Sequence, residues 1–361
     1  MGNRDVADFI EGARNFYRFF DVKPKENVLL IPTAEFVETD PLSLDALKKA
    51  GKEIGAEVVI CIISGERKDI LEDPPLPVTQ AIYASDLFLG MGVKASNPIT
   101  GHCKTALLSR WDYGVKQADI TGGAYVLASD WARFPPEVIL AIARVVTRAL
   151  SNSRTLTITS SNGTHLTLKY DPNLAGGSIS LPILQHGHAL RGTRATFPLG
   201  VIHLDTEEET EGLIVLDAVE GTAGTMAEPM RWTVKQNRVV QIDGGAEAQH
   251  LRAALEKVEN ANYIEKIDFG LNPKARLLEG LIHPRHGEAD RHSGVLKIAL
   301  GDRPGGVSSP FHHNGEVLWP TVEVNGQRII ENGKLRALND PEVIETASRF
   351  GNPAVLLQEV S

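Results

Sequence analysis

The chain has 361 residues, more than a single hydrophobic core usually serves, so we expect two domains. It carries a formal net charge of -9 and no Lys/Arg-rich run, so we expect neither a nucleic-acid nor an anionic-membrane partner. No apolar run is long enough to span a bilayer and the N-terminus lacks an apolar signal core, so we expect a cytoplasmic protein.

Helical and strand patterns alternate over residues 1–150. Apolar residues at helical spacing occur in Val6–Phe20, Ser43–Ala56, Cys103–Val115 and Pro135–Leu150. Short apolar runs typical of strands occur at Asn27–Pro32, Glu57–Ile63 and Asp86–Gly92, and Ala124–Ser129 takes the place of another strand. This alternation predicts an α/β doubly wound domain with a parallel sheet. No G-x-G-x-x-G opens a helix, so a Rossmann dinucleotide is not expected.

The pattern changes near residue 151. Alternating apolar and polar residues around Asn162-Gly163 predict a β-hairpin, and further strand patterns follow up to Leu335. One helical segment, Ala246–Ala261, interrupts them. We therefore expect an α+β, mostly antiparallel domain over residues 151–361 that carries most of the catalytic pocket.

Most of the eleven histidines follow residue 160 and gather in three short stretches. The stretches hold His186 and His188, then His283, His286 and His292, and finally His312 and His313. None has the H-E-x-x-H spacing that places two metal ligands on one helix face. Each histidine alone is compatible with a surface or hydrogen-bonded role, but their clustering favours a functional site because loops carry most sites in such folds. The Asn314-Gly315 pair beside the last stretch is the dipeptide most typical of a hairpin turn.

A lysine lies in the middle of the apolar run Leu296–Leu300. Lys297 is costly to bury unless it is paired or functional. The alternative is an edge strand on which Lys297 faces water. Upstream, Glu265, Lys266 and Asp268 line the start of another strand-like run.

Three segments resemble one known family. They are Phe269–Ala275 (FGLNPKA), Gly294–Asp302 (GVLKIALGD) and Phe311–Leu335 (FHHNGEVLWPTVEVNGQRIIENGKL). In order and spacing they resemble the C-terminal half of the aminopeptidase T metallopeptidases and their relative 2,5-dihydroxypyridine 5,6-dioxygenase. Pro198–Val219 resembles the mid-chain segment of the same family. The resemblance implies an enzyme that is at least a homodimer.

The positions that match the family's metal ligands carry other residue types. Lys266 stands where the family has a carboxylate or histidine before its GxNP segment, and Lys297 stands at the histidine of HIALG. The final His-x-Asp motif reads His312-His313-Asn314, so only His312 keeps a ligand type, and His313 is expected to point elsewhere. An ammonium has no lone pair for a metal. The substitutions thus imply no metal cofactor.

A rebuilt metal centre remains the alternative. If the match is shifted by one residue, Glu265 or Asp268 becomes a ligand instead of Lys266. Iron or zinc would otherwise be held by His312 together with His292, Glu288 or Asp290.

Two lysines in one pocket suggest two kinds of chemistry. If Lys266 and Lys297 share the pocket, burial and like charge disfavour their charged forms, and one could serve as a neutral general base or Schiff-base nucleophile. Otherwise both stay charged and stabilise a carboxylate or an oxyanion. His312 would transfer protons and Asn314 would orient substrate or water.

The expected substrate is a small anionic molecule. Arg191 could hold its carboxylate through two hydrogen bonds, with His186 and His188 as further acid–base candidates and Asn272 as another binding residue. Three functions stay open. The first is a metal-independent hydrolase of an amide or N-heterocycle C–N bond. The others are an Fe(II) ring-cleaving dioxygenase or aminopeptidase with rebuilt ligands, and a non-catalytic ligand-binding protein.

Overall fold

The computed structural model divides the chain into two compact units. Unit 1 comprises residues 1–137 and 182–199, and unit 2 comprises residues 138–181 and 200–361. The structure describes residues 5–64, 72–92, 98–99, 103–121, 125–170, 172, 181–219, 226, 228–277, 288–301, 309 and 311–360. Within these ranges no helix is both long and apolar enough to cross a lipid bilayer.

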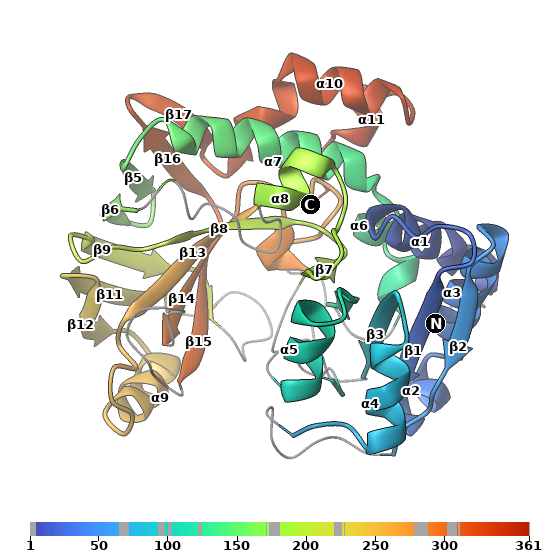
Figure 1. Ribbon diagram of the computed structural model, residues 1–361. Coiled ribbons are helices and arrows are strands. Elements are labelled where there is room, and N and C mark those ends of the chain that lie inside the picture. Colours follow the sequence, from blue (N-terminus) through green and yellow to red (C-terminus); the bar gives the residue numbers. More distant parts are fainter. Residues whose placement is uncertain are drawn as a thin grey trace. The chain divides into compact units, whose positions relative to one another are not determined.

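Unit 1 is built on a parallel five-stranded sheet of order β2-β1-β3-β4-β7 (Figure 1). Its strands are β1 (Asn27–Pro32), β2 (Glu57–Ile60), β3 (Leu87–Met91), β4 (Lys116–Ile120) and β7 (Arg194–Phe197). The helices are α1 (Val6–Phe19), α2 (Ala34–Thr39), α3 (Pro41–Glu53), α4 (Leu76–Tyr83), α5 (Lys104–Trp111), α6 (Asp130–Arg133) and α8 (Leu181–His186), which begins at the unit boundary.

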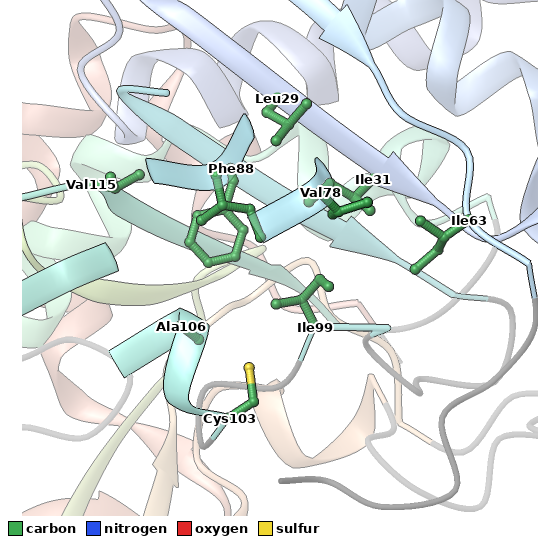
Figure 2. Packing of buried hydrophobic residues seen from close by; sticks show 10 residues of the cluster. Leu29, Ile31, Ile63, Val78, Phe88, Ile99, Cys103, Ala106 and Val115 are labelled. Atoms are coloured by element: carbon green, nitrogen blue, oxygen red, sulfur yellow. The ribbon is translucent and has the colours of Figure 1, made fainter. Parts of the chain in front are cut away.

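Helices cover both faces of this sheet. Figure 2 shows one face, where Leu29 and Phe88 of the sheet belong to the same buried cluster as Ala106 of α5. On the other face α1 and α3 pack together, and a Cβ atom on Gly51 of α3 would lie only 2.4 Å from the side chain of Val58. The predicted doubly wound α/β arrangement is confirmed.

One strand of unit 1 lies elsewhere than the apolar pattern indicated. The segment Ala124–Ser129, expected to be a strand, contains a 3₁₀ turn at Val126–Ala128. The strand that joins the sheet is β4, which lies earlier in the chain. β4 is hard to recognise because it begins with a buried lysine. The ammonium of Lys116 is satisfied by the main-chain carbonyls of Phe20 at 2.7 Å and Asp21 at 3.1 Å.

Unit 2 contains two antiparallel sheets, of order β10-β15-β14-β13-β8 and β12-β11-β9-β6-β5-β16-β17-β18. The first consists of β8 (Val201–Asp205), β10 (Ala218–Val219), β13 (Ile264–Gly270), β14 (Leu296–Gly301) and β15 (His312–Val317). The second consists of β5 (Thr155–Ser160), β6 (His165–Lys169), β9 (Glu211–Leu216), β11 (Met230–Lys235), β12 (Arg238–Asp243), β16 (Pro320–Val324), β17 (Gln327–Glu331) and β18 (Lys334–Leu335). The helices are α7 (Pro136–Ser151), which starts at the end of unit 1, α9 (Ala246–Leu255), α10 (Pro341–Ser348) and α11 (Pro353–Leu356). The predicted antiparallel α+β class is confirmed.

Asn-Gly pairs differ in whether they form a turn. Asn325 and Gly326 have positive φ angles of 50° and 75° and reverse the chain between β16 and β17. Asn314 and Gly315 instead lie inside β15, so the turn expected there is wrong. Gly315 is required by packing, because a Cβ atom on it would lie 2.3 Å from a methyl group of Leu216.

The division of the chain differs from a single boundary near residue 150. Most of α7 belongs to unit 2, and residues 182–199 return to unit 1 to add β7 beside β4. This return has no local signal, because the partner of a parallel strand is distant in sequence and Arg194–Phe197 alternates polar and apolar residues like any exposed strand.

Candidate functional site

The five-stranded sheet of unit 2 has one charged face, which we call the polar face. Side chains alternate across a strand, so the register decides which of them meet. The polar face consists of three rows across β8, β13, β14 and β15: His203–Asp268–Lys297–Glu316, then Asp205–Lys266–Ala299–Asn314, then Gly301–His312. His313 is paired with Leu300 on the opposite face, as expected, and burial lowers the pKa of His313 to about 4.

A β-bulge adds Glu265 to the polar face. The pairing of β13 with β14 shifts between Ile264 and Lys266, which leaves Glu265 as the extra residue. Its Oε2 atom lies 3.2 Å from Nδ1 of His312, two strands away. The intervening strand presents Gly301 beside His312, so no side chain separates the two groups.

The two oxygens of Glu265 hold two different partners. Burial opposes ionisation of Glu265, but the hydrogen bond from His312 and the charge of Lys266 outweigh it and lower the pKa of Glu265. Its Oε1 atom lies 3.2 Å from Nζ of Lys266. With Nδ1 of His312 donating to the carboxylate, Nε2 is the acceptor, and it lies 3.2 Å from Nδ2 of Asn314. The imidazole is 46% exposed, so it is open to a ligand.

Lys297 is buried between two carboxylates. Its Nζ atom donates to Oδ2 of Asp268 at 2.7 Å and to Oδ2 of Asp290 at 2.9 Å. Asp290 lies on the 3₁₀ turn η3 (Ala289–Arg291) and is also ion-paired with Arg291. Burial lowers the pKa of Lys297, but the charges of Asp268 and Asp290 outweigh it and raise the pKa above its ordinary value.

This geometry corrects two expectations for Lys297. It does not lie on an edge strand, because β14 is paired on both sides, with β13 and with β15. Nor is it a neutral amine, because its two carboxylate neighbours favour the ammonium. Of the two roles considered for the lysines, only that of a fixed positive charge fits Lys297.

Two titratable groups of the polar face carried no clear sequence signal. Burial, aided by the charge of Asp290, raises the pKa of Glu316 to about 7. Nδ1 of His203 lies 3.9 Å from Oδ1 of Asp268, and burial lowers the pKa of His203. Within the described part of the chain, that Oδ1 atom is buried and has no hydrogen-bond partner. Alternation along each strand gives the face on which His203 and Glu316 lie. Their place in the same row depends on the strand register, which the sequence does not show.

The residues proposed for a rebuilt metal centre have other partners. Nε2 of His292 lies 3.0 Å from the carbonyl of Val360, and Glu288 accepts the main-chain N–H of Arg276. Asp290 binds the ammonium described above. His283 and His286 lie outside the described residues.

The donor set does not fit a divalent metal. Across the ranges that the structure describes, no three His, Cys, Asp or Glu side chains are grouped as ligands would be. Two buried carboxylates, Asp268 of the polar face and Asp290 of η3, already share the ammonium of Lys297. An ammonium at that point leaves neither room nor charge for a metal ion.

Asn272 stabilises a turn. It follows β13, is buried, and its Oδ1 atom accepts the main-chain N–H of Lys274 at 2.9 Å. The side chain thus shapes the Asn-Pro-Lys turn after the strand, a structural role that the sequence interpretation as a binding residue did not include.

Three further candidates belong to unit 1. The guanidinium of Arg191 binds Oδ1 of Asp86 through two nitrogens, at 3.0 and 2.9 Å. Nδ1 of His188 lies 3.1 Å from the carbonyl of Ala189, and the ring of His186 is 6.3 Å from that of His188. Arg191 therefore already has a carboxylate partner, and the roles of all three in substrate binding stay predictions.

Comparisons with known proteins agree with the resemblance inferred from the three sequence segments. The family model described as 2,5-dihydroxypyridine 5,6-dioxygenase (NicX) matches residues 132–337, a range that contains the whole polar face. The structure of 2,5-dihydroxypyridine dioxygenase from Pseudomonas putida KT2440 superposes with a TM-score of 0.70 at 16% identity, covering 94% of this chain and 100% of that one. Wild-type AmpT from Thermus thermophilus superposes with a TM-score of 0.62 at 14% identity, covering 91% and 99%. No curated protein sequence matches the chain. At these identities the superpositions establish a shared fold.

Proposed function

The chain belongs to the 2,5-dihydroxypyridine 5,6-dioxygenase family, and we propose that within this family it is an enzyme that hydrolyses a C–N bond. Its substrate would be a small anionic molecule, an amide or an N-heterocycle. The observation that carries this proposal is the group formed by Glu265, His312 and Lys266. A carboxylate holds an exposed imidazole and an ammonium at 3.2 Å each. This is the composition that general base catalysis with anion stabilisation requires.

The reaction follows from the roles of these atoms. The side-chain amide of Asn314 turns away from Nε2 of His312, which then takes a proton from water. The water oxygen attacks the carbonyl carbon, and the electron pair of the C=O bond moves to its oxygen. Lys266 stabilises that oxyanion. As the C–N bond breaks, the imidazolium gives its proton to the leaving nitrogen, which leaves a carboxylic acid and an amine. Glu265 stabilises the imidazolium and fixes the ring's orientation.

The positive charges also favour the substrate class. Lys266 is 24% exposed, so its ammonium can reach a bound anion, whereas Lys297 acts as a fixed charge in the neighbouring row of the polar face. Asn314, beside the imidazole, would orient water or the scissile amide. In this proposal no resident metal takes part, because the donor set of the polar face is already occupied by an ammonium.

The test compares variants on a panel of dicarboxylic monoamides, cyclic imides and carboxylated or hydroxylated pyridines. For any compound turned over, we expect His312→Ala to lower kcat by about 10²–10⁴-fold, and Glu265→Gln to lower it less. His313→Ala, altered on the opposite face, serves as the matched control. Label from H₂¹⁸O in the acid product would support hydrolysis, and full activity of His312→Ala would rule out this site.

The second candidate is a ring-cleaving dioxygenase, which the family match favours. It predicts that a dihydroxypyridine consumes O₂ stoichiometrically and that label from ¹⁸O₂ enters the product. Binding of panel compounds without turnover in either assay would instead indicate a ligand-binding protein.

A further inference from the structure

Each row of the polar face has one nitrogen-bearing side chain that reaches solvent. These are His203 in the first row, Lys266 in the second and His312 in the third, whose side chains are 29%, 24% and 46% exposed. The other nitrogen groups of the rows, Lys297 and Asn314, are buried. The proposed reaction uses Lys266 and His312 but gives no role to His203, although His203 is as accessible as Lys266.

His203 lies on the side of Lys266 that faces away from His312. It belongs to the edge strand β8, next to β13, which carries Lys266, whereas His312 is on β15, two strands beyond β13 in the other direction. His203 and Lys266 are diagonal neighbours in the register, and such neighbours are about 7–8 Å apart. A small molecule whose carbonyl group lies between His312 and Lys266 can therefore extend toward His203.

A buried carboxylate decides which nitrogen of His203 carries the proton. Oδ1 of Asp268 is buried, has no hydrogen-bond partner among the described residues, and lies 3.9 Å from Nδ1 of His203. The other oxygen, Oδ2, already accepts from Lys297. A lone pair on Nδ1 would be repelled by Oδ1, whereas an N–H group would be attracted to it, so Nδ1 is the protonated nitrogen. Nε2 of His203 is then a hydrogen-bond acceptor.

The surroundings of His203 keep its ring neutral at pH 7. Burial lowers the pKa of His203 below its ordinary value of 6.5, and the charge of Lys266 acts in the same direction. The carboxylates of Asp268, Asp205 and Glu265 act against burial without overcoming it. A neutral imidazole with its proton on Nδ1 offers Nε2 to an O–H or N–H group and not to an anion.

We propose that His203 is a specificity-determining residue of the polar face, and that its Nε2 atom accepts a hydrogen bond from a hydroxyl or N–H group of the substrate. That group lies at the end of the substrate away from the bond that is hydrolysed. The inference rests on the proposed function in taking Lys266 and His312 as the groups at that bond. It narrows the substrate to an anionic amide or N-heterocycle that carries a second polar group, a hydrogen-bond donor.

Calorimetry of ligand binding tests this role without requiring turnover. Each isomer of hydroxypyridine carboxylic acid is compared with its O-methyl ether, which lacks the donor. We expect wild type to bind at least one hydroxyl compound about tenfold more tightly than its ether, because one hydrogen bond is lost. His203→Ala should reduce this ratio to about one while it binds the ether as wild type does, which also shows that the variant is folded. His165→Ala, which alters an exposed histidine on β6, is the matched control and should keep the ratio.

The outcomes separate this inference from the proposed function. A preference for the hydroxyl compound that persists in His203→Ala would overturn the inference, as would the absence of any preference, or of any binding, in wild type. If the preference depends on His203 but no compound is hydrolysed, the role of His203 stands and the proposed reaction does not. If hydrolysis depends on His312 and the preference is indifferent to His203, the reaction stands and the role of His203 does not.

A second measurement needs no ligand. In ¹⁵N-labelled protein, the imidazole signals that disappear in His203→Ala belong to His203. Their chemical shifts should show a proton on Nδ1 and none on Nε2. A proton on Nε2 would overturn the inference, because that nitrogen could then not accept a hydrogen bond from the substrate.

Discussion

Ionisation on the polar face is decided by neighbours across the strands. Lys297 and Glu316 sit opposite each other, yet carboxylates favour the charged form of the first while burial favours the neutral form of the second. The sequence showed that burying Lys297 would need a partner. The sequence could not show which residues are the partners of Lys297. Asp268 lies beside Lys297 because of the register between β13 and β14, and Asp290 because of the 3₁₀ turn η3. Likewise His203 and Glu316 have no local signal.

Glu316 predicts a specific pH dependence of stability. Its pKa is raised from 4.5 to about 7, so between these values the folded protein holds a proton that the unfolded chain has lost. The contribution of Glu316 to the free energy of unfolding is therefore fully present below pH 4.5 and is lost as the pH rises through 7. We expect Glu316→Gln to remove a decline of about 3 kcal/mol between pH 4.5 and 8, measured by urea unfolding. The exposed Glu323→Gln is the control, and equal pH slopes for Glu316→Gln and wild type would contradict the prediction.

At the scale of elements, the type of most strands and helices could be predicted, but not their neighbours. The hairpin at Asn162-Gly163 formed as expected, because its turn chemistry and alternation are local. Asn314-Gly315 did not, because packing of Gly315 on Leu216 decided its place within β15. β14 looked like an edge strand for a related reason: its lysine is accommodated by tertiary partners.

Gly301, at the end of β14, is required for the strand arrangement. Its φ is +124°, and a Cβ atom would lie 1.7 Å from the carbonyl oxygen of Phe311. We expect Gly301→Ala to lower the free energy of unfolding by about 3 kcal/mol or more, through both clash and backbone strain. The control is Gly326→Ala, where φ is +75° and the space is open, so only about 1–2 kcal/mol should be lost. Similar losses in chemical denaturation of both variants would refute the role of the clash.

For the whole molecule, the sequence predicted two units of the observed fold classes with a single boundary between them. In the structure the chain passes from one unit to the other three times, after residues 137, 181 and 199. Composition changes near residue 151 because antiparallel strands begin there. The return of residues 182–199 to unit 1 depends on a parallel pairing of β7 with β4, which are more than seventy residues apart. Such a pairing leaves no mark on either segment alone.

The interleaving predicts how isolated pieces behave. Residues 1–137 alone lack β7 and expose the edge of β4, so we expect this fragment to unfold at lower temperature and to aggregate. Joining residues 182–199 to it through a flexible Gly/Ser linker should raise the melting temperature measured by circular dichroism. A linker followed by the same eighteen residues in scrambled order is the control. Equal melting temperatures would show that β7 contributes nothing to unit 1.

The same crossing constrains the order in which the protein can fold while it is being synthesised. A ribosome releases α7 and the β5–β6 hairpin before it releases β7. Synthesis of unit 1 therefore begins first, but unit 1 cannot complete its sheet until β7 has emerged. Until then the edge of β4 stays unpaired while residues 138–181 of unit 2 emerge. Translation speed between residues 138 and 199 should therefore influence the yield of native protein, and a chaperone that shields β4 would act in that interval.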